Sequence, residues 1–377
     1  MNFPKISKGE IYLVGGAVRD KLMASEIGTE HNDEDYVVIG ATEESLRHDF
    51  PDGLWLWEVG KSFPVLKIKR NEKYIDISMG RKERKSGIGT RGFEVEFGPD
   101  VTLEEDLSRR DLTMNAMAMD KNGQLHDPFG GREDIKRRTL RHVTNAFKED
   151  PLRVYRLARF AARFGFLVDP ETTDLAHKIK HELFSLSSDR VILEFVKACK
   201  SHFPWRFLEV LEECCCKDVH FDNITSFASG DLAKAIIYGA DEVLIAAIML
   251  YSSKEAFDNL TKRLPLPNNY WSAACHLREY FELHTSDMVG NDYVTLIDSL
   301  NRGSLGVHRI LLMLDSMGIG FQRDRLYKAY TAYNKVSPVE IQARYIKADM
   351  VCPIGKDFGK LLREERAGKI NEVLGII

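Results

Sequence analysis

The sequence predicts an α+β fold, in which a small α/β domain with a mixed sheet precedes an all-helical remainder. Short β-rich runs alternate with helical stretches from residue 11 to about residue 130, a pattern typical of packed strands and helices. From about residue 147 onward, Leu, Ala, Phe and Arg recur at helical spacing and the β-rich alternation stops. A chain of 377 residues is too long for one typical core, so we expect roughly two to four packed units.

The composition describes a soluble globular protein with one strongly basic region. Hydrophobic residues make up 44% of the chain, charged residues make up 29%, and the formal net charge is −4. Residues 132–163 nevertheless contain ten lysines and arginines against four acidic residues. A solvated helix face would interleave opposite charges at i,i+4, so this excess predicts a localised polyanion site.

No segment of the sequence predicts secretion or insertion into a membrane. The N-terminus lacks the apolar run of a signal peptide. Residues 232–251 are the best membrane candidate, but they contain three charged residues and are predicted to form a buried core helix. Residues Cys214 to Cys216 fit no zinc spacing, and all six cysteines are predicted to be reduced thiols in helices. We therefore expect a cytoplasmic protein that binds no membrane.

The first predicted strand and helix flank a glycine turn. Residues 11–14 predict a buried strand, and residues 17–23 predict the helix that follows it. Gly15 and Gly16 lie at the turn between them, where small residues let backbone N–H groups approach a polyphosphate closely. Such turns are common, so the signal is weak on its own.

Two aspartates separated by one residue precede the next predicted strand, residues 36–39. Strand alternation places Asp33 and Asp35 on one face and Glu34 on the other. Such a pair is usually a solvated strand end or a turn cap, but two neighbouring carboxylates also suit Mg²⁺. After a glycine turn, in this strand-helix-strand order, the pair predicts metal-assisted phosphoryl chemistry on a nucleotide.

Two further segments with polar residues each allow a structural and a functional interpretation. Asp76 lies in a predicted strand, residues 74–78, and is either an edge-strand aspartate that faces water or a third carboxylate near the pair. Residues 109–116 place two arginines, an aspartate and an asparagine at the start of an otherwise apolar helix. That segment is either an N-cap with an exposed ion pair or a site where Arg110 reaches phosphate and nearby polar groups meet a ribose.

An amphipathic helix with Pro151 in its first turn continues to residue 164. At about 100° per residue, its apolar face consists of Val154, Leu157, Phe160, Ala161 and Phe164, and one polar stripe consists of Arg156, Arg159 and Arg163. Arg153 lies within the apolar arc, with Asp150 beside it. These two residues either form a structural ion pair or read the edge of a nucleobase.

These segments resemble, in order, the motifs of class II tRNA nucleotidyltransferases, a family that includes CCA-adding enzymes and bacterial poly(A) polymerases. The resemblance rests on residues 15–20 with Asp33 and Asp35, residues 109–116, residues 127–131 and residues 149–159, and residues 188–191 resemble the start of a further motif. It is strong over roughly residues 11–195 and faint beyond them.

The resemblance implies that Asp33 and Asp35 are the catalytic ligands of Mg²⁺. Asp76 joins them in catalysis if it is the third carboxylate. Gly16 and Arg19 would hold the triphosphate of the nucleotide.

The remaining implied roles concern the sugar and the base. Arg110 would lie near the phosphate and sugar. Asp150 and Arg153 would act as a protein template that pairs with CTP or ATP through Watson–Crick-like bonds, and Arg156 and Arg159 would complete the nucleotide pocket.

The resemblance also implies a domain order. Residues 1–130 would form the nucleotidyltransferase head, residues 131–200 a helical neck that templates the nucleotide, and residues 201–377 a helical body and tail that bind the tRNA acceptor arm. Residues 127–131 would form a hinge, and residues 85–93 a flexible loop that helps to switch from CTP to ATP. No His-Asp pair occurs in residues 246–252, so we expect no His-Asp phosphohydrolase domain.

The expected activity is template-independent addition of C, C and A to the 3′ end of tRNA from CTP and ATP, with release of pyrophosphate. Poly(A) or A-only addition would use the same motifs, but residues 81–87, the compact length and the negative net charge favour CCA addition. A catalytically silent RNA-binding protein on this fold is the non-enzyme alternative. Retention of Asp33 and Asp35 argues against it, because carboxylates without a metal would repel RNA. The sequence does not indicate the oligomeric state, and a monomer is the default expectation.

Overall fold

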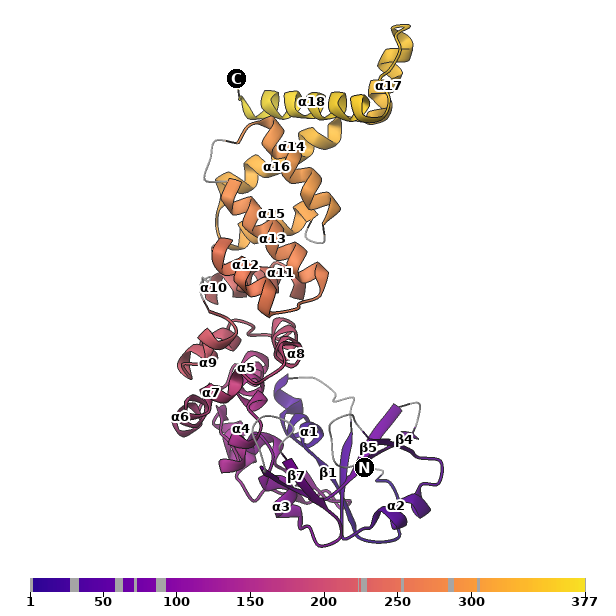
Figure 1. The fold of residues 1–377 in the computed structure, drawn as a ribbon, viewed down its shortest axis with the longest axis vertical. Coiled ribbons are helices and arrows are strands. Elements are labelled where there is room, and N and C mark those ends of the chain that lie inside the picture. The colour runs from indigo at the N-terminus through magenta and orange to yellow at the C-terminus, as the bar shows by residue number, and fades with distance from the viewer. Residues whose placement is uncertain are drawn as a thin grey trace. The chain divides into compact units, whose positions relative to one another are not determined.

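The computed structural model describes residues 3–27, 34–57, 64–70, 73–85, 93–222, 224, 229–251, 254–283, 288–303 and 306–376. Asp33 and residues 86–92 of the expected flexible loop therefore lie outside the described residues. The chain forms two compact units, Met1–Glu194 with Arg206–Val219 and Phe195–Trp205 with His220–Ile377 (Figure 1). Each unit is described by itself.

The first unit contains a seven-stranded mixed sheet, as the sequence predicts. In order across the sheet, the strands are β3 (Leu54–Trp57), β4 (Pro64–Arg70), β5 (Lys73–Met79), β2 (Asp35–Ile39), β1 (Glu10–Val14), β8 (Ala118–Met119) and β9 (Leu125–His126). The β2–β5 pair is parallel, and the other neighbours are antiparallel. The strands that the sequence predicts at residues 11–14, 36–39, 65–69 and 74–78 are confirmed as β1, β2, β4 and β5.

Apolar runs explain why the centre of this sheet is buried. In β1 the four residues after Glu10 are all buried, and in β2 the residues Tyr36, Val37 and Val38 are buried too. A continuous run of this kind suits a strand that is covered on both faces. The helices that accompany the sheet are α1 (Gly16–Ile27), α2 (Glu43–Asp49) and α3 (Leu103–Ser108), and β6 (Arg81–Lys85) pairs with β7 (Phe93–Phe97) in a separate ribbon.

The rest of the first unit is mainly helical. Its elements are η1 (Thr113–Asn115), α4 (Gly131–Lys136), β10 (Thr139–Leu140), η2 (Asn145–Glu149), α5 (Leu152–Phe164), β11 (Leu167–Val168), α6 (Pro170–Lys178), α7 (Lys180–Leu183), the start of α8 (Ser188–Cys199), α9 (Arg206–Glu213) and η3 (Lys217–Val219). The predicted apolar face of α5 is buried, and Tyr155 stacks on Phe207 of α9. The expectation of helices alone beyond residue 147 misses β11, which pairs in parallel with β10.

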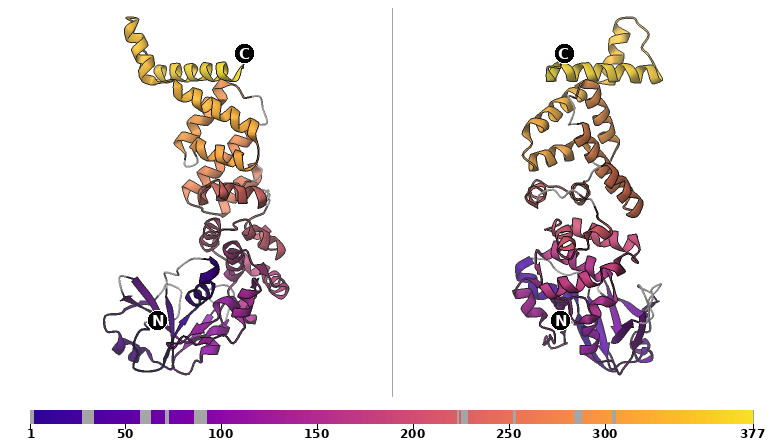
Figure 2. Two further views of the ribbon diagram at one scale, coloured as in Figure 1. Left: turned by 180° about the vertical axis from the view of Figure 1, so that it is seen from behind. Right: turned by 60° about the vertical axis from the view of Figure 1, so that its left-hand side comes forward.

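In the second unit, all described elements are helices. After the end of α8 they are α10 (Ser229–Ile237), α11 (Glu242–Met249), α12 (Lys254–Arg263), α13 (Asn268–Leu283), α14 (Gly290–Arg302), α15 (Gly306–Ser316), α16 (Gly320–Lys335), α17 (Pro338–Lys347) and α18 (Gly355–Leu374). Figure 1 labels these helices, and in Figure 2 they can be followed by colour, from red near α10 to yellow at α18.

Two sequence predictions in the second half need correction. Residues 232–251 form not one helix but parts of α10 and α11, because Gly239 turns the chain at φ +90° and Asp241 caps α11 through the backbone N–H of Leu244. All residues of α11 from Val243 onward are buried. The six cysteines are free thiols, but the run from Cys214 to Cys216 follows α9 and is not helical, and Cys352 lies between α17 and α18. In the described residues, no helix is both long and apolar enough to cross a membrane.

Candidate nucleotide and metal site

The glycine turn lies between β1 and α1, where the sequence predicts it. Gly15 has φ +69°, a backbone conformation that favours glycine. A Cβ atom at Gly15 would lie 3.0 Å from Nη1 of Arg110, so the missing side chain leaves room for that guanidinium. Arg110 thus lies directly beside the turn, and its expected place near the phosphate and sugar stays a prediction.

Among the described residues, Arg110 is held by an ion pair with Asp106. Its Nη2 lies 3.1 Å from Oδ2 of Asp106, while its Nε is buried and has no hydrogen-bond partner among the described residues. Burial would raise the pKa of Asp106, but the charges of Arg109 and Arg110 outweigh burial and lower the pKa to about 2. Asp106 therefore stays ionised and orients both arginines.

A row of charged side chains crosses the sheet beside the turn. Asp35 of β2 is paired in register with Asp76 of β5, and Asp76 is paired with Lys67 of β4. Residues paired across a ladder project from the same face. The Lys67 ammonium lies 2.6 and 2.9 Å from the two carboxylate oxygens of Asp76. The edge-strand interpretation of Asp76 is wrong, because β5 lies between β4 and β2.

The donors in this row suit a hard cation. Carboxylate oxygens are the ligands that Mg²⁺ prefers, and Asp35 and Asp76 provide two carboxylates on neighbouring strands. Glu34 points elsewhere and accepts a hydrogen bond from the Tyr36 hydroxyl at 2.8 Å. The described residues contain no group of three His, Cys, Asp or Glu side chains that could hold a metal. Asp33, the other expected ligand, lies outside the described residues.

Residues 109–116 do not begin a helix, contrary to the sequence prediction. Helix α3 ends at Ser108, and the chain then bends into the short 3₁₀ helix η1. The Asp111 carboxylate accepts hydrogen bonds from the Leu112 backbone N–H at 2.8 Å and from Asn115 Nδ2 at 2.9 Å. Because Asp111 is buried, the interpretation as an exposed ion pair is also wrong.

The arginine stripe of α5 faces three carboxylates from three other elements. Arg156 binds Asp111, with its Nε at 2.8 Å from Oδ2, and Arg163 binds Asp20 of α1 at 2.9 Å. Arg159 binds Glu194 of α8. Burial would raise the pKa of Asp111, but the charge of Arg156 and the hydrogen bond from Asn115 outweigh it and hold the pKa below its usual range.

These pairs correct the interpretation of the basic region. At least six of its ten basic residues form ion pairs, namely Lys136, Arg137, Arg141, Arg156, Arg159 and Arg163. In four of these pairs, the carboxylate lies more than four residues from its basic partner, so i,i+4 spacing does not reveal it. The local excess of basic residues therefore does not measure free positive charge.

Arg19 lies beneath the turn rather than at its surface. The side chain is 2% exposed, its Nε lies 2.7 Å from Asp20 Oδ1, and its Nη1 lies 2.6 Å from Asn115 Oδ1. Its guanidinium lies 5.3 and 5.0 Å from the ring centres of Phe160 and Phe164 in α5. Its expected contact with the triphosphate stays a prediction, as does that of Gly16, the first residue of α1.

Asp150 and Arg153 lie close in sequence but do not pair with each other. The Asp150 carboxylate accepts a hydrogen bond from the Leu152 backbone N–H at 3.1 Å. Its Oδ2 forms an ion pair with Arg190 Nη2 at 3.2 Å. Arg153 donates to two backbone carbonyls, Ala146 O at 2.7 Å and Arg109 O at 2.6 Å. The proposed structural ion pair is therefore wrong, and the proposed reading of a nucleobase stays a prediction.

Sequence reasoning missed three charged residues of this region: Lys67, Asp106 and Glu194. Glu194 could have been found from the sequence, because it lies at the edge of the apolar arc of residues 188–199. In the structure Glu194 is 4% exposed. An acidic side chain buried there requires a basic partner. Lys67 and Asp106 gave no such signal, because alternating charge is ordinary in strands and helix starts.

Comparison with known proteins gives the context of this site. Residues 11–141 match the family described as the poly A polymerase head domain. Over 211 residues the chain is 50% identical to the multifunctional CCA protein of Vibrio vulnificus, a match that covers 54% of this chain and 49% of that protein. Over 210 residues it is 49% identical to the protein of the same name from Actinobacillus pleuropneumoniae, covering 54% of this chain and 48% of that protein. The chain thus spans about half the length of the curated relatives it matches.

Solved structures share the fold over almost the whole chain. The CCA-adding enzyme of Bacillus stearothermophilus in complex with CTP has a TM-score of 0.64 at 24% identity, covering 96% of this chain and 89% of that one. The Thermotoga maritima CCA-adding enzyme complexed with tRNA has a TM-score of 0.66 at 21% identity, covering 97% and 91%. At identities below 25%, these two structures show that the fold is shared. The similarity in sequence rests on the head-domain match and on the relatives that are about 50% identical over part of the chain. In its head-domain sequence and in its fold, the chain is thus similar to class II tRNA nucleotidyltransferases, a family that includes CCA-adding enzymes and bacterial poly(A) polymerases.

Proposed function

We propose that this protein adds C, C and A to the 3′ end of tRNA, using CTP and ATP and releasing pyrophosphate. The observation that carries the proposal is the 50% identity over 211 residues to a protein named multifunctional CCA protein. The site supports the chemistry independently, because a glycine turn, a buried arginine and two register-paired carboxylates lie on adjacent elements. The cytoplasm is the proposed location, where tRNA and both nucleotides are present.

The phosphates of the nucleotide would bind at the turn before α1. Backbone N–H groups at a helix start favour anions, and Gly15 and Gly16 let the phosphates come close. Arg110 would contribute the guanidinium whose Nε is buried without a partner among the described residues. Arg19 would act from below the turn, through Asp20 and Asn115, to fix its orientation.

The base would be read at the start of α5. Asp150 offers acceptors, and Arg153 offers a planar fork of donors. Arg190 and the two backbone carbonyls that bind Arg153 hold these side chains in fixed positions. Arg156 and Arg159 would complete the pocket while remaining anchored to Asp111 and Glu194.

Asp33 and Asp35 would hold Mg²⁺, with Asp76 as the third carboxylate. The chemistry that bound Mg²⁺ supplies there is stabilisation of the attacking and leaving oxygens of an in-line displacement. The 3′-hydroxyl oxygen of tRNA loses its proton to solvent and forms the new bond to the α-phosphorus, while the bond between the α-phosphorus and the leaving pyrophosphate oxygen breaks. The pairing of β2 with β5 fixes the positions of the Asp35 and Asp76 carboxylates. Arg110 would bind the phosphates of the leaving pyrophosphate. The helical second unit would bind the acceptor arm of the tRNA.

The test uses purified protein, Mg²⁺ and three tRNA transcripts that end before CCA, after CC, or after CCA. Each nucleoside triphosphate is supplied alone and in combination, and products are separated at single-nucleotide resolution. Two C additions followed by one A and a stop are expected. A long A ladder would instead show a poly(A) polymerase, and a single A on the CC-ended transcript alone would show an A-adding enzyme. Absence of any extension by well-folded wild-type protein would contradict the proposal. The Asp35→Asn variant, which should fold like the wild type, is the inactive control.

A further inference from the structure

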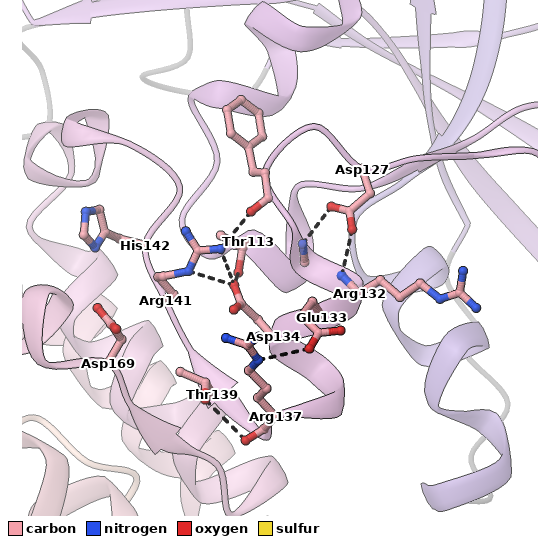
Figure 3. A network of polar contacts seen from close by, with 12 residues as sticks. Thr113, Asp127, Arg132, Glu133, Asp134, Arg137, Thr139, Arg141, His142 and Asp169 are labelled. Atoms are coloured by element: carbon pink, nitrogen blue, oxygen red, sulfur yellow. Dashed lines mark hydrogen bonds and ion pairs between the residues drawn. The ribbon is translucent and has the colours of Figure 1, made fainter.

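A buried carboxylate links α4 to the segment that carries Asp111 and Asn115 (Figure 3). Asp134 of α4 is 6% exposed, and its Oδ2 accepts a hydrogen bond from the Thr113 hydroxyl at 2.5 Å. The same oxygen lies 2.8 Å from Arg141 Nη2, which also donates to the backbone carbonyl of Phe129 at 2.9 Å. One carboxylate therefore joins three separate stretches of backbone.

Backbone contacts reinforce this link. The Thr113 N–H donates to the Arg141 carbonyl at 2.9 Å. A Cβ atom at Gly131 would lie 2.2 Å from the Thr113 carbonyl oxygen, so only glycine allows α4 to approach η1 this closely. Asp127 caps the start of α4 by accepting from the N–H groups of Gly131 and Arg132 at 2.7 and 2.9 Å (Figure 3). Residues 127–141 are thus bound to Thr113 by side chains and by backbone.

Thr113 lies between two residues that bind arginines of the proposed nucleotide pocket. Two residues before it, Asp111 binds Arg156, and two residues after it, Asn115 binds Arg19. Both arginines belong to the proposed nucleotide pocket. A shift of η1 would therefore move the anchors of Arg19 and Arg156 together.

We propose that Asp134 is a positioning residue for the nucleotide site, acting through the Thr113 hydroxyl on Asp111 and Asn115. The inference rests on the proposed function and names residues that do not contact the nucleotide. Loss of the Thr113–Asp134 hydrogen bond loosens η1, so that nucleotide binding weakens and the choice between CTP and ATP becomes less strict.

The test compares Thr113→Val, which keeps the shape of the side chain and removes the hydroxyl, with Thr113→Ser, which keeps the hydroxyl. Glu133→Gln is the matched control, because Glu133 is the neighbouring acidic residue of α4 and pairs with Arg137 at the surface. Dissociation constants for CTP and ATP are measured with Mg²⁺, together with kcat and KM for each addition. Hydrogen exchange of peptides covering residues 110–118 reports the order of η1 directly.

Thr113→Val is expected to raise the dissociation constant of the correct nucleotide about tenfold and to reduce the CTP to ATP preference. Exchange of residues 110–118 should increase at the same time. Thr113→Ser and Glu133→Gln should behave like the wild type. A purely structural role would lower the melting temperature of Thr113→Val but leave its binding and selectivity unchanged, and that result would overturn the inference. Failure of the wild type to bind either nucleotide would instead reject the proposed function, and this inference with it.

Discussion

At the residue scale, the most informative contact is the ion pair between Lys67 and Asp76. Each side chain is about one-third exposed, with solvent-accessible fractions of 33% and 35%. The ammonium contacts both oxygens of a carboxylate that is paired in register with Asp35. Lys67 is therefore a counter-ion of the carboxylate row, and we expect it to compete there with a divalent cation.

Replacing Lys67 by Met should strengthen the binding of a divalent cation. A unit charge and a divalent cation about 4 Å apart repel by about 2 kcal/mol in a water-like environment, so we expect a roughly thirtyfold lower dissociation constant. The measurement is titration with Mn²⁺, followed by electron paramagnetic resonance, on the protein without tRNA. Binding can thus be compared whether or not the variant remains active.

Lys121→Met is the matched control for the Lys67 variant. Lys121 is exposed in the turn between β8 and β9, and β8 lies two strand spacings from Asp35 of β2 and three from Asp76 of β5. At about 4.8 Å per spacing, Lys121 is about one screening length or more, roughly 8–10 Å at moderate salt, from the carboxylate row. Equal changes in both variants, or none in Lys67→Met, would show that Lys67 does not compete with the cation.

Single residues also show how far sequence reasoning reaches. The periodicity of α5 correctly predicted that Arg156, Arg159 and Arg163 share a stripe, because 3.6-residue spacing is a local property. It could not identify their partners. Asp111, 45 residues from Arg156, and Asp20, 143 residues from Arg163, are brought to α5 only by the tertiary fold. A local count of charges consequently overestimated the free positive charge of this region, and the expected polyanion site stays a prediction.

At the element scale, α5 and α1 are joined by one buried aspartate. Asp20 is 1% exposed and binds both Arg19 of its own helix and Arg163 of α5. The ring faces of Phe160 and Phe164 cover the Arg19 guanidinium. The helix that follows the glycine turn is therefore fixed to the helix that would read the base.

The Asp20→Asn variant should destabilise the first unit by roughly 3 kcal/mol, because it leaves two guanidinium groups without their buried counter-charge. Thermal unfolding followed by circular dichroism measures the effect. Glu133→Gln, which breaks a surface pair with Arg137, should change stability by less than about 1 kcal/mol. Similar melting temperatures for the wild type and Asp20→Asn would mean that Asp20 contributes little to the packing of α1 on α5.

Helices and strands were predicted well where the spacing of apolar residues determines the secondary structure. They were predicted poorly where polar side chains form hydrogen bonds with the backbone. The central strands and α5 follow their apolar patterns. Residues 109–116 were predicted to begin a helix, but Asp111 accepts from Leu112 N and Asn115 Nδ2 and so favours a tight turn. The break before α11 had a readable signal, since Gly239 precedes the N-cap Asp241 by two residues.

At the scale of the whole molecule, the division into two compact units predicts two unfolding transitions. The second unit contains His220, which is buried, and burial and the nearby charge of Arg263 lower its pKa to about 4. His276 of the same unit and His142 of the first unit also have lowered pKa values, mainly through burial. Folding therefore favours the neutral form of all three histidines.

The direction of the pH effect follows from these shifts. The pKa of an unfolded histidine is about 6.5, above the value of about 4 for folded His220. The stability contributed by keeping His220 neutral is fully present above pH 6.5 and is lost as the pH falls toward 4, because the unfolded chain then binds the extra proton. The transition of the second unit should move to lower temperature across this window.

The His220→Gln variant should make that transition less sensitive to pH between 6.5 and 4, since Gln cannot take up a proton there. Differential scanning calorimetry at several pH values measures both transitions. Asp20→Asn identifies the transition of the first unit by lowering it alone, so the remaining one belongs to the unit that contains His220. The difference between the wild type and His220→Gln should be largest at neutral pH and shrink on acidification. A single transition that both substitutions shift alike would show instead that the units unfold as one.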